Sequence, residues 1–233
     1  MLPTATMPKG MTLSALVWLL VYLMTSAGHA ADTYELLFKE GTLDSLPRTS
    51  FLDYRKSVTA PGNEMLETGN SGTVTLKFAQ EGMADLYFDP GSKVRGVGSF
   101  PADVGNPLIM YFLETVIRDL AGSSGGSPFY IRNRIKAALL KQRPVRDLEI
   151  SLDGRKLKAR TIVLFPFKND PASDKMRGVE TLALTFTVSE DVPGWYYSLK
   201  AETTVDRGRR SERPDTLPAY SNSIVFLNQG EAE

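Results

Sequence analysis

One wide apolar helix face, set between two stretches of strand-like sequence, constrains the fold of this 233-residue chain more than any other feature. At about 100° per residue, the apolar side chains between residues 109 and 120 cover an arc of about 160° on one side of a helix. A face this wide needs a broad apolar partner, which the concave side of a strongly curved sheet would provide. The residues of this face are Ile109, Met110, Phe112, Leu113, Val116, Ile117 and Leu120.

Start and stop signals place this face in the first of two helices. Asn106 precedes Pro107, an order typical of a helix N-terminus, because the amide side chain caps free N–H groups and proline needs no hydrogen bond there. Gly122 ends this helix, and Ser127-Pro128 repeats the start signal for a second helix with a narrower apolar stripe. The sequence therefore predicts a helical pair inserted at about residues 106–142.

Alternating apolar and polar residues predict strands on both sides of the helical pair. Asp153-Gly154 predicts a two-residue hairpin, because both residue types tolerate the positive φ angles of a type I′ turn. We interpret the charged segment 206–218 as a mobile surface loop and 230–233 as a fraying tail. The predicted fold class is α+β, with a curved, mostly antiparallel, half-barrel-like sheet and the inserted helices in one domain at residues 31–233. Strands are predicted at 34–38, 52–56, 74–78, 84–88, a glycine-rich run toward Phe100, 148–152, 155–167, 179–188, 195–205 and 223–227.

Residues 1–30 have the pattern of a secretory signal peptide. Lys9 precedes an apolar run from Met11 to Met24, and Gly28 and Ala30 supply the small residues of a cleavage site. An uncleaved membrane anchor is the alternative, but the run is shorter than the about 20 residues that cross a bilayer. No Cys follows the run, so we expect no lipid-modified N-terminus. We expect cleavage near Ala30 and a periplasmic or secreted protein.

The chain would then contain neither His nor Cys, because the sole histidine is His29. Nucleophile systems that use imidazole or thiol are excluded, as are zinc and copper sites built on those ligands. We therefore predict no catalytic residue, no metal site and no cofactor. Activity based on paired carboxylates or a Ser/Lys pair remains the weaker alternative, because no spacing of acidic residues singles out a site.

Net charge and the remaining motifs exclude further classes. The whole chain has 27 basic and 27 acidic residues, and loss of Lys9 leaves it close to neutral. Nucleic acid is therefore not an expected partner, since phosphate binding needs a basic surface. Gly122-Ser-Ser-Gly-Gly126 lacks the Lys-Ser/Thr ending of a phosphate-binding loop. The spacing of Asn169, Asp170 and Asp174 does not match a calcium-binding loop.

Five residues are candidates for contact with an apolar ligand. Met110, Phe112 and Phe129 would line a cavity if the helical pair formed its wall, and methionine adapts its shape to irregular ligands. Trp195 and Tyr197 would share one face of a strand and could stack against a ligand. The alternative for all five is ordinary core packing.

Cations cluster on and after the second helix. Arg132 and Lys136 fall on one flank of that helix, and Arg134 and Lys141 on the other, with Arg143 and Arg146 following. They would form either a solvated helix surface or a surface patch that binds anionic lipid headgroups or an acidic partner. A second cluster, which acidic residues dilute, is interpreted as part of the charged loop and comprises Arg207, Arg209, Arg210 and Arg213.

The sequence resembles two groups of known proteins. The segments 104–114 and 126–136 are similar to uncharacterised periplasmic proteins of Gram-negative bacteria. A signal peptide, a long antiparallel sheet and a helical pair that could cover it resemble the half-barrel carriers of the bacterial envelope, the LolA/LolB type. That resemblance implies an apolar pocket that accepts acyl chains, and it carries over no functional residues.

The sequence thus supports two functions. The first is an exported periplasmic binding protein that holds a lipid or acyl chain between the sheet and the helices, with transient contact to a membrane surface. The alternative is a non-enzymatic envelope module that binds another envelope protein and takes no small ligand.

Overall fold

The structure is a computed structural model that describes residues 33–176, 178–204 and 219–231. The predicted signal peptide, the charged loop 206–218 and its four arginines lie outside the described residues. Within the described ranges, no helix is both long and apolar enough to cross a membrane.

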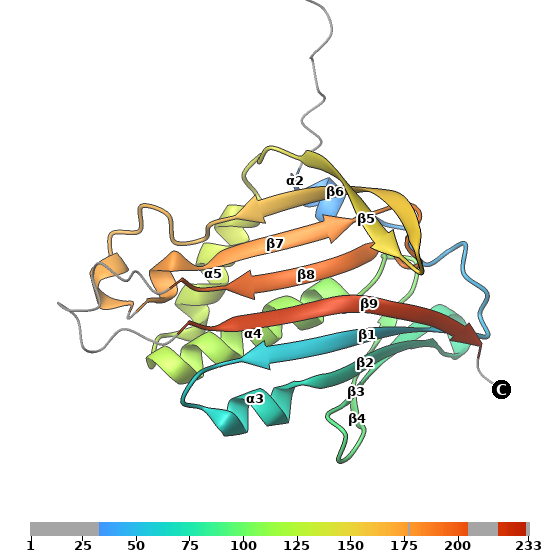
Figure 1. Cartoon of the computed structure of the whole chain (residues 1–233), viewed down its shortest axis with the longest axis horizontal. Coiled ribbons are helices and arrows are strands. Elements are labelled where there is room, and N and C mark those ends of the chain that lie inside the picture. The colour runs from blue at the N-terminus through green and yellow to red at the C-terminus, as the bar shows by residue number, and fades with distance from the viewer. Residues whose placement is uncertain (1–32, 177, 205–218, 232–233) are drawn as a thin grey trace, which may run out of the picture. The chain divides into compact units, whose positions relative to one another are not determined.

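A nine-stranded antiparallel sheet forms the framework of the described chain, in the order β4-β3-β2-β1-β9-β8-β7-β6-β5. Two four-stranded meanders lie side by side, and the last strand, β9, joins them by pairing with β1 and β8 (Figure 1). The strands are β1 (Ser50–Thr59), β2 (Gly72–Phe78), β3 (Met83–Asp89), β4 (Arg95–Pro101), β5 (Arg146–Leu152), β6 (Arg155–Leu164), β7 (Ala183–Val188), β8 (Tyr196–Glu202) and β9 (Ser221–Glu231).

The inserted helical pair is present, which confirms the predicted α+β class. It consists of α4 (Leu108–Ser124) and α5 (Pro128–Leu139), which connect the two meanders and lie across one face of the sheet (Figure 1). That face is apolar because alternate residues of each strand point toward it, as in β3, where every second residue is buried. Two short helices, α2 (Thr33–Leu37) and α3 (Glu64–Asn70), are the other α-helices among the described residues.

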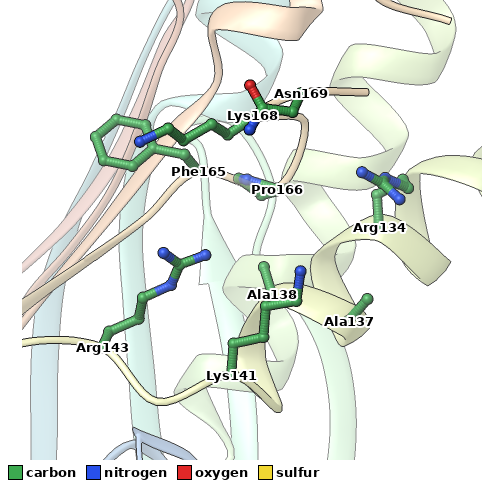
Figure 2. Close-up of a pocket in the computed structure, with 9 residues that line it drawn as sticks. All are labelled: Arg134, Ala137, Ala138, Lys141, Arg143, Phe165, Pro166, Lys168 and Asn169. Carbon is green, nitrogen blue, oxygen red and sulfur yellow. The ribbon is translucent and has the colours of Figure 1, made fainter. Parts of the chain in front are cut away.

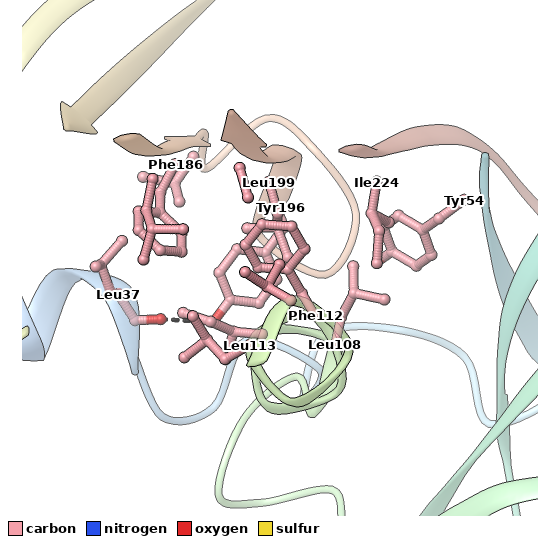
Figure 3. Close-up of a cluster of buried hydrophobic side chains, with 14 of the residues drawn as sticks. Leu37, Tyr54, Leu108, Phe112, Leu113, Phe186, Tyr196, Leu199 and Ile224 are labelled. Carbon is pink, nitrogen blue, oxygen red and sulfur yellow. Dashed lines mark hydrogen bonds between the residues drawn. The ribbon is translucent and has the colours of Figure 1, made fainter. Parts of the chain in front are cut away.

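Tightly packed side chains fill the interface between α4 and the sheet. Phe112 is fully buried, and its ring meets that of Phe186 edge-on, with centroids 6.1 Å apart. Leu108 and Leu113 flank it on the helix (Figure 3). The sheet side of this cluster includes Tyr54, Phe186, Tyr196, Leu199 and Ile224 (Figure 3).

Asn106 fixes the start of α4, as its capping pattern predicts. Its Oδ1 accepts a hydrogen bond from the Leu108 N–H at 3.0 Å. Its Nδ2 donates to the Tyr54 hydroxyl at 3.0 Å and to the Gly194 carbonyl at 2.8 Å. One buried amide therefore joins the helix to β1 and to the β7–β8 turn.

One prediction about the N-terminal part is wrong, and one helix was missed. Residues 34–37 belong to the helix α2 and not to a strand, and the Phe38 N–H donates to the Tyr34 carbonyl at 2.8 Å just after the helix. Leu36 and Leu37 are both buried, whereas a half-exposed strand would bury only one of two neighbours. The helix α3 was not expected, although Asn63 caps it by accepting from the Leu66 N–H at 3.1 Å.

The C-terminal strands differ from prediction mainly at their ends. The Asp153-Gly154 hairpin is confirmed, with φ angles of 50° and 75°. The strand predicted at 155–167 ends at Leu164, and 179–181 form a 3-10 turn before β7. Gly230 and Glu231 do not fray, because both pair with β1 as the end of β9.

Candidate functional site

Two pockets lie between α5 and the segment that follows β6, here called the 165–179 loop, and share no lining residue. The first, the apolar pocket, has a volume of about 300 Å³. Ile131 of α5 and Phe167, Met176 and Val179 of the loop provide its apolar wall. Ile131, Phe167 and Val179 are also core residues, so the floor of this pocket continues into the hydrophobic core.

The second pocket, here called the cationic pocket, has a volume of about 310 Å³. Four basic residues line it, namely Arg134, Lys141, Arg143 and Lys168 (Figure 2). None of its nine lining residues is acidic, and the remainder are Ala137, Ala138, Phe165, Pro166 and Asn169.

The buried Asp170 contacts one lining residue of each pocket. Its Oδ1 accepts hydrogen bonds from the Tyr130 hydroxyl at 2.7 Å and from the Ala172 N–H at 2.8 Å. Its Oδ2 lies 2.6 Å from Nε of Arg134, and this contact is an ion pair without the alignment of a hydrogen bond. Because Tyr130 lines the apolar pocket and Arg134 the cationic one, a single carboxylate positions a side chain of each.

The carboxyl group of Asp170 stays ionised despite its burial. Burial by itself raises the pKa, but the hydrogen bonds from Tyr130 and Ala172 and the charge of Arg134 outweigh it. The pKa of Asp170 therefore lies below its ordinary value of 3.8. A charged Asp170 keeps α5 and the 165–179 loop attached to each other at neutral pH.

The predicted ligand residues of the helical pair lie outside both pockets. Phe112 is part of the packed core under α4. Met110 is 50% exposed and Phe129 is 73% exposed, so neither is enclosed. Both pockets are lined by residues of α5, whereas these three predicted residues line neither.

Trp195 and Tyr197 do not share a face, which corrects the alternation expected for a strand. Trp195 precedes β8 and has a φ angle of 80°, so it and Tyr196 are both buried. The indole Nε1–H of Trp195 donates to the Leu36 carbonyl at 3.0 Å, and Nζ of Lys39 lies 4.3 Å from the ring centroid. Tyr197 is partly exposed, and its hydroxyl donates to the Ser151 carbonyl at 3.3 Å.

The predicted basic patch divides between two environments. Arg132 forms a two-pronged pair with Glu114 at 2.9 and 3.0 Å, and Lys136 is exposed. Arg134 and Lys141 instead line the cationic pocket, together with Arg143. The predicted patch did not include Lys168, because it lies on a polar connection far along the chain.

A groove of about 730 Å³ runs along the β5–β6 edge, with acidic residues among its lining. Glu190 lies 3.4 Å from Nζ of Lys39 and 3.7 Å from Arg160, and Glu149 lies 3.3 Å from Nζ of Lys156. The side chains of Glu190 and Glu149 are 71% and 67% exposed. Exposed carboxylates paired with cations are typical of a solvated surface and not of general acid–base catalysis.

A buried polar cluster lies under the C-terminal half of α4. Asp119 accepts hydrogen bonds from the Tyr220 hydroxyl at 2.8 Å and from Nδ2 of Asn222 at 3.1 Å, and burial raises its pKa. Lys56 is 1% exposed and donates to the Asn70 carbonyl at 2.9 Å. Residues of this cluster line neither the apolar nor the cationic pocket, so we assign it a structural role.

No group of three or more His, Cys, Asp or Glu side chains that could hold a metal ion occurs within the described ranges. The prediction that the protein uses no metal stays a prediction.

No protein-family model matches this sequence, and no curated protein matches it either. Among solved structures, the crystal structure of the Mycobacterium tuberculosis lipoprotein LppX is similar over 86% of this chain and 96% of the LppX chain. The two chains are 11% identical, and the TM-score is 0.38. The function of this protein is therefore argued below from its own residues.

Proposed function

We propose that this protein is a non-enzymatic binding protein that holds the apolar part of a lipid, such as an acyl chain, in the apolar pocket beside α5. The observation that carries the proposal is the wall formed by Ile131, Phe167, Met176 and Val179 around a space of about 300 Å³. Lys175 and two serines also line this space, but its core residues favour an apolar occupant, because each methylene moved there from water contributes about 0.8 kcal/mol.

The side chains of the wall support a ligand that varies in shape. Met176 is partly exposed at the pocket, and its flexible thioether can follow a chain of irregular outline. Tyr130 adds an aromatic ring whose hydroxyl is held by Asp170. A tyrosine held by a hydrogen bond, next to a flexible methionine, suits an apolar chain of variable outline.

This location differs from the one expected from sequence. The interface of α4 with the sheet is filled by Phe112 and its neighbours, whereas the apolar pocket lies at the other helix of the pair (Figure 3). The proposal therefore places the ligand beside α5. It also includes export by the predicted signal peptide to the periplasm. There the protein could exchange lipid with a membrane surface.

The test is binding of an uncharged fluorescent probe, N-phenyl-1-naphthylamine, to the purified protein. Met176→Asp places a carboxylate in the wall and should weaken binding by about tenfold or more, because the charge would lose solvent when the probe enters. Met110→Asp is the matched control, since Met110 is half-exposed and lies outside the pocket. It should change the affinity by less than about twofold.

Thermal unfolding of both variants identifies any loss that is due to misfolding. Equal binding by the two variants would contradict the assignment of the pocket. A wild-type protein that binds no probe would contradict the proposed function and favour the alternative of an envelope interaction module.

A further inference from the structure

We infer that the cationic pocket is an anion-binding site that takes a phosphate group, and that this phosphate belongs to the headgroup of the lipid whose acyl chain lies in the apolar pocket. The second part of the inference rests on the proposed function, because only a bound lipid would place a headgroup there. The first part stands on the charge and geometry of the cationic pocket.

Three of the four basic side chains in this pocket are unpaired within the described ranges. Arg134 forms an ion pair with Asp170, but the side chains of Lys141, Arg143 and Lys168 form no ion pair and no hydrogen bond there. Like charges gathered around one space repel each other unless a counter-charge lies between them. Figure 2 shows the guanidinium of Arg143 and the ammonium of Lys141 extending from the end of α5 toward the loop that carries Lys168. The arrangement therefore favours an anionic occupant.

Arg143 provides a second and independent observation. Its Nε is buried and has no hydrogen-bond partner among the described residues. A buried donor without an acceptor is unusual, and an oxygen of a bound anion would satisfy it. An arginine donates from Nε and a terminal nitrogen in a fixed fork, and this fork matches two oxygens of a phosphate.

The backbone around the cationic pocket is already held in place. The Arg143 N–H donates to Oγ1 of Thr33 at 2.8 Å, so the base of this side chain is anchored to α2. On the opposite wall, the Lys168 N–H donates to the Phe165 carbonyl at 3.2 Å. Asn169 follows with a φ angle of 62°, a left-handed conformation that asparagine tolerates better than most residues. Little ordering of the backbone would accompany binding, although the exposed side chains of Lys141 and Lys168 would lose freedom.

The two pockets are close enough for one molecule to occupy both. Both are formed by α5 and the 165–179 loop, with Ile131 lining one pocket and Arg134 and Ala138 the other. At 1.5 Å per residue, these positions are separated by about 5–10 Å along the helix axis. A ligand whose apolar chain and phosphate headgroup have this spacing would contact residues of both pockets along α5.

The experiment measures binding of the full-length protein to three probes by calorimetry. The probes are inorganic phosphate, short-chain dihexanoyl phosphatidic acid, and dihexanoylglycerol, which differs from the second only in its missing phosphate. Wild-type protein should bind the phosphatidic acid about tenfold more tightly than the diacylglycerol, because the phosphate adds charge-assisted hydrogen bonds. High salt should reduce this preference.

Arg143→Gln and Lys168→Gln should each lower the preference for the phosphate-bearing lipid to about twofold or less, and leave diacylglycerol binding unchanged. Lys136→Gln is the matched control, because Lys136 is an exposed cation of the same helix that does not line the pocket. It should retain the full preference. If Arg143→Gln unfolds the protein, Lys168→Gln still tests the site. It removes only the charge of an exposed side chain on a loop, so we expect the fold to persist.

The outcomes are distinct. If the wild type shows the preference, its loss in all three variants alike, or in none of them, would overturn the anion site. Tight binding of inorganic phosphate that Arg143→Gln abolishes, without any preference between the lipids, would support the anion site and overturn the headgroup assignment. If N-phenyl-1-naphthylamine fails to bind while phosphate binding persists, the proposed function falls and the anion site stands.

Discussion

The buried Lys56 makes a quantitative prediction about how stability depends on pH. Its ammonium is enclosed between Phe88 and Tyr111, with Nζ 5.3 and 5.8 Å from their ring centroids. Burial lowers its pKa from an ordinary 10.5 to about 8, and Asp119 only partly opposes this effect. A difference of this size means that ionising Lys56 destabilises the folded state by about 3 kcal/mol relative to the unfolded chain.

The sign follows from proton binding. Between about pH 8 and pH 10 the unfolded chain keeps a proton on Lys56 that the folded protein has lost, so the free energy of unfolding rises by about 1.4 kcal/mol per pH unit. Above about pH 10 the buried tyrosines oppose this trend, because a phenol of raised pKa favours the folded state only while it is protonated. Burial raises the pKa of Tyr54 and of Tyr196 in this way.

Urea unfolding of wild-type protein and Lys56→Met at several pH values between about 7 and 10 provides the assay. The wild type should gain about 2–3 kcal/mol between about pH 8 and pH 10 that the variant does not gain. Lys136→Met, at an exposed position, should keep the wild-type slope. Parallel slopes for wild type and Lys56→Met would refute the claim that this lysine is held in an unfavourable charged state.

Two further predictions concern the core and the hydrogen bond between Tyr130 and Asp170. Phe112→Ala should cost about 3–5 kcal/mol in urea unfolding, because it empties a packed site; a loss under about 1 kcal/mol would mean that Phe112 lines an open cavity instead. Tyr130→Phe removes a hydrogen bond to ionised Asp170 and should cost about 1 kcal/mol at neutral pH. The lowered pKa of Asp170 stabilises the folded protein at any pH above the pKa of this group in the unfolded chain, and this contribution is lost as the pH falls. Because Tyr130→Phe removes part of this stabilisation, the variant should begin acid unfolding at higher pH than the wild type. An unchanged acid midpoint would contradict this.

Local sequence signals predicted the parts of the fold that local chemistry determines. Asn106 caps α4 and Asp153-Gly154 forms the hairpin because each acts on its own neighbours. Residues 34–38 were predicted incorrectly because five residues are too few to separate a helical from an alternating pattern. The ordered end of β9 depends on pairing between Gly230 and Phe51, and no local signal marks so distant a partner.

The candidate site was predictable only in part, for the same reason. The cations of α5 stand out in the sequence, but the contact of Tyr130 with Asp170 spans 40 residues. Helical spacing also cannot separate the rim of an apolar arc from its centre, which is why Met110 is half-exposed while Phe112 is buried. The nearby motif at Asn169 and Asp170 was considered only for calcium, whereas Asp170 instead connects the loop to α5.

Photocrosslinking tests the central claim most directly. A phosphatidic acid with a diazirine near the end of one acyl chain, bound to the full-length protein and activated by light, should label peptides that carry Ile131, Phe167 or Met176. Excess unlabelled phosphatidic acid should prevent that labelling. Labelling confined to the exposed side chains of Phe129 or Met110, or labelling that excess lipid does not reduce, would contradict a lipid site beside α5.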